Sequence, residues 1–294
     1  VRGGCALAAE GEVFVFGSTF VPRTVVLVLR GNGSQVPDAQ ASSDVEALAW
    51  LTSLRWETLQ PMTAERQGTA CAVLPPVAGA PARSDVLVVG GKAFNSLVVL
   101  DTAERYNISA DAWSDAALLP VPVVFASAAS TGDARALVAG GAVALNASAP
   151  FGSAFFLGVL EYMAASDAWV QLAVTLPRIR VSHAVALVGT DLYLLGGRAT
   201  QYGYPAEELA AVDVLHTATL QWRRVPDLAS GFPVPSSDPP AGAALLGQRL
   251  YLVRSIGPAI YLDVGAATAA QAWVQGSQDD PGSRSEERRV GKEC

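Results

Sequence analysis

Short apolar runs alternate with turn residues along nearly the whole chain. Three of these runs end in a pair of glycines, at 86–91, 137–141 and 192–197. Runs of this length that are rich in Val, Leu and Ala and closed by glycine favour β-strands over helices. The chain also has 27 glycines and 18 prolines, which interrupt it too often for long helices.

The glycine pairs belong to an internal repeat. Their second residues, Gly91, Gly141 and Gly197, are 50 and 56 residues apart. Tyr106 and Tyr162 each precede a tryptophan by seven residues. The tryptophans that follow this phase are Trp56, Trp113, Trp169, Trp222 and Trp273. A fixed period of about 50 residues indicates stacked copies of one supersecondary unit.

A unit with an apolar run, a glycine pair, a later tyrosine and then a tryptophan resembles the kelch repeat. The resemblance covers nearly all of the chain except its C-terminal tail. It implies that each unit is a four-stranded propeller blade, with the glycine pair closing the second strand and the tryptophan on the fourth. The motif residues are Gly90, Gly91, Tyr106, Trp113, Gly140, Gly141, Tyr162, Trp169, Gly196, Gly197 and Trp222.

We therefore expect an all-β fold, a kelch-type β-propeller. About five four-stranded blades are visible, and kelch rings usually close with six or seven, so the ring is expected to be incomplete. The propeller is expected over residues 1–280. Its blades are predicted at about 3–60, 68–119, 123–176, 182–228 and 242–274. The first and last blades lack the glycine pair, and Leu215 stands where the fourth would have its tyrosine.

Two segments need a separate interpretation. The uncharged stretch 136–160 is long enough for a membrane helix, but glycines and Pro150 interrupt it, so we predict two buried strands joined by a loop. Residues 281–294 are expected to be a disordered tail, and 284–294 resemble the translation of a sequencing adapter. The chain also lacks an initiator Met, which favours a fragment. Without the tail, Cys5 and Cys71 remain, too few for a disulfide framework or a metal site.

The charge and the catalytic residue types exclude several functions. The net charge is −7 and no cluster of Lys and Arg occurs in the body of the chain, so nucleic acid is not an expected partner. Two histidines without a metal-ligand spacing, and no nucleophile elbow or phosphate loop, predict neither catalysis nor a metal or cofactor. Copper radical oxidases of similar fold need paired histidines that this chain lacks.

One enzymatic alternative stays open, a sialic-acid epimerase similar to the bacterial kelch-type enzyme. It would use Arg, Glu and His side chains facing the axis. The candidates at or near predicted inner strands are Arg66, Arg178, Arg180 and His183. The competing interpretation is that Arg66 and Arg178 belong to the ordinary kelch linker before an inner strand.

We expect the chain to be a non-catalytic scaffold that binds a protein partner, because propeller loops are held on a rigid frame. The loops after the second strands should share one face. Their candidate contact residues are Lys92, Phe94, Asn95, Phe151, Arg198, Gln201, Tyr202 and Tyr204. Exposed aromatic residues beside Arg or Lys are typical of binding hot spots. The alternative is that these aromatic side chains fold back onto their own blades.

Three Asn-x-Ser sequons, at Asn32, Asn107 and Asn146, fall in predicted turns or loops and are possible N-glycosylation sites. They favour a secreted or cell-surface protein. The alternative is a cytosolic kelch adaptor that presents substrates to a ubiquitin ligase.

Overall fold

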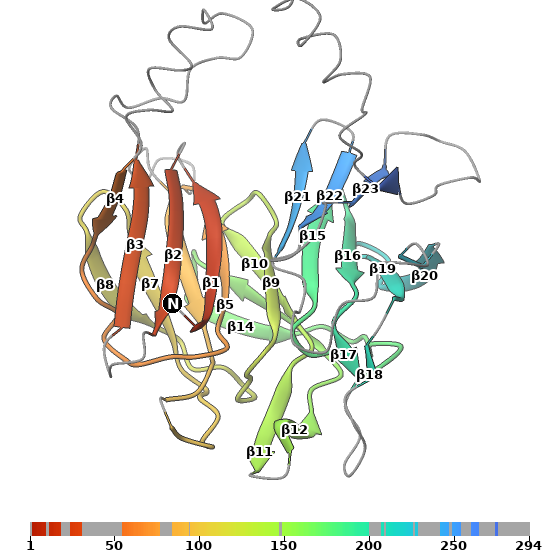
Figure 1. The fold of residues 1–294 in the computed structure, drawn as a ribbon, viewed down its shortest axis with the longest axis horizontal. Helices are drawn as coiled ribbons and strands as arrows, with labels where there is room; N and C mark the ends of the chain where they lie inside the picture. Colours follow the sequence, from red (N-terminus) through yellow and green to blue (C-terminus); the bar gives the residue numbers. More distant parts are fainter. Residues whose placement is uncertain are drawn as a thin grey trace, which may run out of the picture. The chain divides into compact units, whose positions relative to one another are not determined.

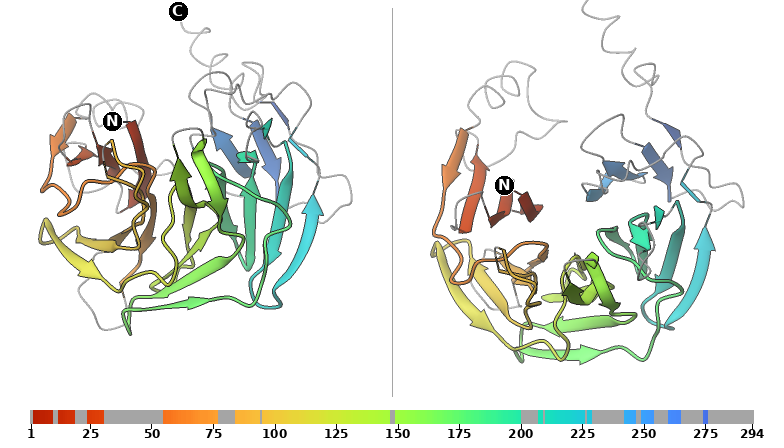
Figure 2. Two further views of the ribbon diagram at one scale, coloured as in Figure 1. Left: turned by 90° about the horizontal axis from the view of Figure 1, so that it is seen from below. Right: turned by 60° about the horizontal axis from the view of Figure 1, so that its bottom comes forward.

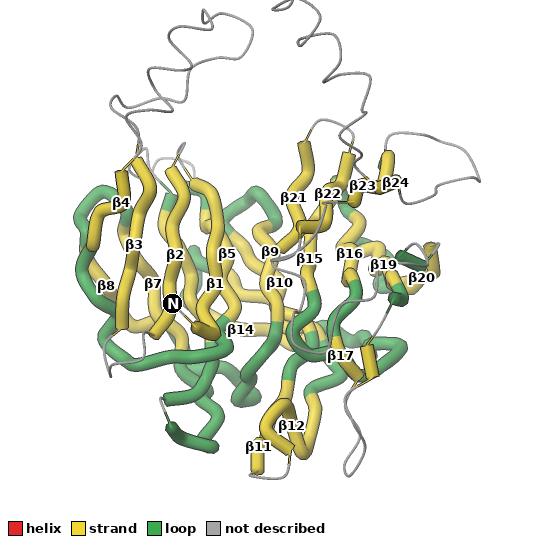
Figure 3. The backbone as a smooth tube through the Cα atoms, viewed as in Figure 1, coloured by secondary structure: helices red, strands yellow, loops and turns green. Residues whose placement is uncertain are grey.

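The chain folds into antiparallel β-sheets in the computed structural model (Figures 1 and 3). The structure describes residues 2–9, 12–18, 24–30, 55–76, 84–93, 95–146, 149–199, 207–208, 210–225, 227–228, 242–246, 249–253, 260–264 and 274–275. No α-helix of membrane-spanning length and hydropathy occurs in this part of the chain. Two compact units are present, one of Val1–Ser182 with Ala199–Pro205 and one of His183–Arg198 with Ala206–Cys294.

The first unit contains three four-stranded sheets, each a meander of neighbouring strands. The first sheet consists of β1 (Arg2–Ala9), β2 (Glu12–Ser18), β3 (Thr24–Arg30) and β4 (Arg55–Thr58). The second consists of β5 (Ala70–Leu74), β6 (Asp85–Val89), β7 (Ala103–Asn107) and β8 (Ala112–Ala116). The third consists of β9 (Ser127–Ser130), β10 (Arg135–Ala139), β13 (Val159–Met163) and β14 (Ala168–Gln171). A hairpin of β11 (Ala142–Asn146) and β12 (Ala149–Phe155) connects β10 to β13.

The second unit contains the fourth and fifth sheets. The fourth consists of β15 (Ala184–Val188), β16 (Asp191–Leu195), β19 (Val212–His216) and β20 (Gln221–Val225). The short pair β17 (Arg198–Ala199) and β18 (Glu207–Glu208) lies between β16 and β19 in the chain. The fifth consists of β21 (Gly242–Leu246), β22 (Arg249–Val253), β23 (Ile260–Asp263) and β24 (Val274–Gln275).

The expected all-β fold of four-stranded sheets is confirmed. The glycine pairs directly follow β6, β10 and β16, and tryptophans lie on β4, β8, β14 and β20. The interpretation of 136–160 needs a correction, because the connection expected as a loop itself forms the hairpin of β11 and β12. Val143 and Phe155, which belong to residue types enriched in strands, lie in this hairpin. Trp273 and the tail 281–294 lie outside the described residues.

The second sheet is buried on both faces, which explains why β6 is an unbroken apolar run. One face packs against the third sheet, its neighbour in Figure 2, through Ala70, Ala72 and Leu87. The other face contributes Cys71 and Val88 to a separate core cluster. Cys71 is disulfide-bonded, a cross-link that the cysteine count alone did not predict.

The glycine pairs allow the segment that enters the next sheet to approach closely. Gly90 and Gly91 have φ of 61° and 91°, and a Cβ on Gly90 would lie 2.1 Å from the carbonyl oxygen of Val123. The N–H of Gly91 donates to the same oxygen at 2.8 Å. Gly141 likewise donates to the carbonyl of Arg180 at 2.9 Å. Side chains at these positions would separate neighbouring repeats.

Tyr106 and Trp113 form a latch between the second sheet and the first. They are cross-strand neighbours with ring centroids 5.0 Å apart. Trp113 Nε1 donates to the carbonyl of Gln60, just beyond β4, at 2.9 Å. The Tyr106 hydroxyl donates at 2.6 Å to Asp111, whose carboxylate also accepts the N–H of Gln60 at 3.1 Å. The latch therefore binds backbone groups of the preceding sheet.

The same latch recurs between the third sheet and the second. Trp169 Nε1 donates to the carbonyl of Ala117 at 2.8 Å, and the Tyr162 hydroxyl donates to Asp167 at 2.6 Å. Asp167 also accepts the N–H of Ala117 at 2.9 Å. Both latch aspartates adopt the left-handed backbone conformation, with φ of 46° at Asp111 and 45° at Asp167. Asp tolerates this conformation better than most residues.

The fourth sheet lacks the tyrosine and the aspartate of the latch. Leu215 pairs with Trp222 where the other sheets have tyrosine, and Leu220, with φ of 55°, stands where they have aspartate. Trp222 Nε1 is buried without a hydrogen-bond partner in the described part of the chain. The missing tyrosine was predicted from the repeat, whereas the missing aspartate was not.

Candidate functional site

Connections between antiparallel strands alternate between the two ends of each sheet. In the second and third sheets one end carries the connections after the second and fourth strands, and we call it the loop end. It comprises residues 90–102, 117–126, 140–158 and 172–182. The opposite turn end carries the short turns 108–111, 131–134 and 164–167.

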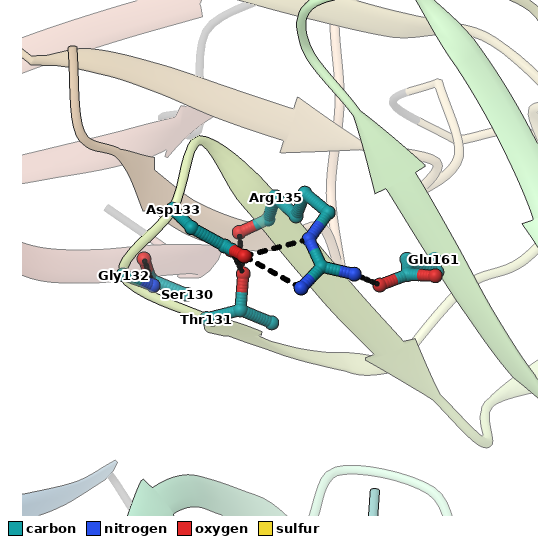
Figure 4. Close-up of polar contacts among 6 residues, drawn as sticks. All are labelled: Ser130, Thr131, Gly132, Asp133, Arg135 and Glu161. Carbon is teal, nitrogen blue, oxygen red and sulfur yellow. Dashed lines mark hydrogen bonds and ion pairs between the residues drawn. The ribbon is translucent and has the colours of Figure 1, made fainter. Parts of the chain in front are cut away.

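The turn end is polar. At the β9–β10 turn Arg135 donates to Asp133 at 2.9 Å through Nε and to Glu161 at 2.6 Å through Nη1 (Figure 4). Thr131 also donates its hydroxyl to Asp133. The bond from Arg135 lowers the pKa of the Asp133 carboxyl, although burial acts in the opposite direction. These groups satisfy one another at the surface and present no apolar area to a partner.

The loop end is apolar by comparison. Leu97 is 48% exposed, Val98 67%, Leu118 64% and Leu157 38%. These four lie in loop-end connections, and the other large exposed apolar side chains of the described residues, Trp56 and Val170, lie on the outer strands β4 and β14. This end of the second and third sheets is therefore the candidate interaction surface.

The structure places two of the predicted contact residues around the Leu97–Val98 segment. Lys92 is half-buried, exchanges backbone hydrogen bonds with Gln67, and directs Nζ to the Gln67 side chain at 3.4 Å. Asn95 is exposed, with φ of 54°. Leu97 and Val98 were not among the predicted contact residues, because the run 97–100 has the composition of a strand.

The other predicted contact residues do not join this group in the described part of the chain. Arg198 is 4% exposed, so its expected presentation on a loop surface is wrong. It directly follows the glycine pair Gly196–Gly197. The side chain of Phe151, in β12, lies outside the described residues. So do the whole residues Phe94, Gln201, Tyr202 and Tyr204.

Arg66, one of the three arginines proposed for the enzymatic alternative, forms hydrogen bonds in the interior. Arg66 is 1% exposed and donates through Nε to Glu104 at 2.8 Å and through Nη1 to the carbonyls of Gly90 and Thr102. Glu104 also accepts the N–H and hydroxyl of Thr63. This network ties the linker to β6 and β7.

Two of the other three candidates for the enzymatic alternative are also buried. Arg180 and His183 are 1% and 4% exposed, and Arg178 is half-buried. Among the described residues no group of His, Cys, Asp and Glu could hold a metal ion.

One predicted sequon can be examined in the fold. Asn107 donates through Nδ2 to Asp85 at 3.1 Å, and its Oδ1 accepts the N–H of Ala110 at 2.8 Å. A glycan on Nδ2 would have to alter the bond to Asp85. Asn32 and the side chain of Asn146 lie outside the described residues.

Comparison with known proteins identifies the repeat. The family model of the Kelch motif matches residues 179–229, which contain the fourth sheet. This segment is a kelch repeat. No curated protein matches the chain. The chain is similar in fold to the solved structure of YjhT, with a TM-score of 0.59 and 18% identity over 85% of this chain and 71% of that chain.

Proposed function

We propose that this kelch-repeat chain is a non-catalytic scaffold whose loop end binds a protein partner. Kelch repeats generally mediate protein interactions. The observation that supports this surface is the exposure of Leu97, Val98, Leu118 and Leu157 at one end of the sheets, opposite a polar turn end. Protein interfaces bury such apolar residues at their centre within a polar rim.

The frame behind Leu97 and Val98 supports the same proposal. Lys92 is paired with Gln67, and the N–H of Leu100 donates to the carbonyl of Gly91 at 2.9 Å. The loop therefore leaves and re-enters the sheet at fixed points. A loop held in this way loses less conformational entropy when a partner binds.

The burial of Arg66 supports a non-catalytic function. A sialic-acid epimerase would need arginine side chains turned to a substrate, whereas the guanidinium of Arg66 is bound to Glu104 and to backbone carbonyls.

Site-specific photo-cross-linking tests the proposal. Benzoylphenylalanine would replace Val98 or Leu118 in the full chain, made in its source cells. Val170 is the matched control, because it is 43% exposed but lies on β14. We expect one shared partner to cross-link from 98 and 118 and not from 170. Identical capture from all three positions, or none from 98 and 118, would contradict the proposal.

An affinity measurement would follow with the purified partner. Val98→Asp should weaken binding by about tenfold or more, because it places a charge in the apolar centre of the interface. Val170→Asp should change the affinity by less than about twofold. Equal effects of the two substitutions would overturn the assignment of the surface.

A further inference from the structure

Cys71 lies on the face of the second sheet that is turned toward the first. It pairs with Val88 across β5 and β6 and is 8% exposed in a cluster with Met62 and Tyr106. Leu59, which directly follows β4, packs against the same cluster. Its neighbours Ala70 and Ala72 instead join the cluster with the third sheet, as the alternation of side chains along a strand requires.

Cys71 is disulfide-bonded, and the other cysteines of the chain are Cys5 and Cys294. Cys5 belongs to β1, where it pairs with Phe16 of β2. β1 makes the main contact of the first sheet with β5 (Figure 1). A disulfide requires Cα atoms about 4.4–6.8 Å apart, which neighbouring strands can provide. We infer that Cys71 is bonded to Cys5 and that this bond cross-links the first two repeats.

The cross-link complements the latch at the opposite margin of the same joint. The latch joins β8 to the segment after β4, through Trp113 and Gln60. The disulfide joins the first strands of the two sheets, β1 and β5. The two sheets are therefore held together at both the first and the fourth strand.

The bond also specifies the environment in which the chain matures. Its two thiols lose two protons and two electrons, and an external disulfide accepts them by exchange and leaves as two thiols. Such bonds persist in secretory, periplasmic and extracellular environments and are rare in the reducing cytosol. The chain therefore folds in an oxidising compartment, which also supports the secreted location that the sequons favoured.

Peptide mapping of the native protein tests the inference. The chain would be purified from its source after alkylation of free thiols at lysis and digested with trypsin without reduction. We expect a linked pair of peptides 3–23 and 67–83, which separate on reduction. Alkylated Cys71, or a link from Cys71 to the peptide that carries Cys294, would overturn it.

Thermal unfolding gives a second readout. A reductant should lower the melting temperature of the wild type by about 10 °C, because the bond closes a long loop in the unfolded chain. Cys71→Ser and Cys5→Ser should melt at the reduced temperature and lose the response. Cys294→Ser is the control and should keep the melting temperature of the wild type and its response to reductant. A Cys5→Ser variant that still responds to reductant would contradict the assignment.

Discussion

Removing the Asp167 carboxylate should weaken the joint between the second and third sheets. Its oxygen accepts the Tyr162 hydroxyl at 2.6 Å and the N–H of Ala117 at 2.9 Å. Asp167→Gly removes both hydrogen bonds and tolerates the φ of 45° at this position. The side chain of Tyr162 is fully buried, so its hydroxyl would have to find another acceptor.

The expected loss is about 2 kcal/mol in the free energy of unfolding. Each hydrogen bond contributes about 1 kcal/mol, the ordinary net value, because Asp167 is exposed to water. Glycine adopts the left-handed conformation without strain, which stabilises the folded variant by about 1 kcal/mol. Its greater freedom in the unfolded chain destabilises the variant by about 1 kcal/mol, so the two effects offset each other. Asp111→Gly should cost a similar amount at the preceding joint.

Urea unfolding followed by tryptophan fluorescence measures these differences. Asp167→Asn keeps an acceptor oxygen and should cost less than about 1 kcal/mol. Leu220→Gly is the positional control, because Leu220 is half-buried and has φ of 55° but no carboxylate, and it should lose less stability than Asp167→Gly. The reasoning would be refuted if Asp167→Gly fell within about 0.5 kcal/mol of the wild type, or if Asn were as harmful as Gly.

Three further predictions concern the interior and the pH. Gly90→Ala should cost about 3 kcal/mol in urea unfolding, because its Cβ would lie 2.1 Å from the Val123 carbonyl oxygen and its φ is 61°. Arg66→Met should cost about 3 kcal/mol in the same assay, because it leaves the Glu104 carboxylate buried beside the lost guanidinium. The bond from Tyr162, followed by that from the N–H of Ala117, lowers the pKa of Asp167. The contribution of the Asp167 carboxylate to stability is therefore complete above about pH 4, its pKa in the unfolded chain, and is lost as the pH falls through the folded pKa. On acidification the urea midpoint should fall more in the wild type than in Asp167→Asn.

Each of these three predictions can be contradicted by a specific result. Gly132→Ala is the control for Gly90, because its φ is 83° and nothing lies within 4 Å of the added Cβ, so it should cost only about 1 kcal/mol. Equal losses at the two glycines would reject the close-contact explanation. A neutral Arg66→Met would mean that Glu104 is satisfied by Thr63 and Ala64 alone. Parallel pH profiles of wild type and Asp167→Asn would show that the Tyr162 bond does not shift the carboxyl.

Much of the fold could be predicted because the repeat depends on bulky or unusual residues. Gly-Gly is needed where the next segment approaches, and Trp113 and Trp169 fill the same position in successive sheets. These residues recur at constant spacing, so one sequence shows them. Asp111 and Asp167 recur with the same phase, but aspartate is common in turns, so only their bonds to tyrosine revealed their role.

The candidate surface was harder to predict than the fold. Leu97 and Val98 belong to an apolar run that resembles a buried strand, yet both side chains are exposed. Arg198 shows the reverse error, since a charged residue after a glycine pair is buried. Local composition does not reveal which side of a connection faces the core. The disulfide of Cys71 was missed for a related reason, because cysteines far apart in the chain carry no spacing signal.

The latch has an asymmetry that bears on how such repeats diverge. The third sheet supplies specific side chains, those of Tyr162, Asp167 and Trp169. The second sheet supplies only the peptide N–H and carbonyl of Ala117, which follows β8. Every amino acid except proline offers that peptide pair. Most substitutions of Ala117 therefore leave the hydrogen bonds between the two sheets intact. A lineage can replace most residues of a repeat and still dock it on its neighbour, so distant chains can share a blade geometry at low sequence identity.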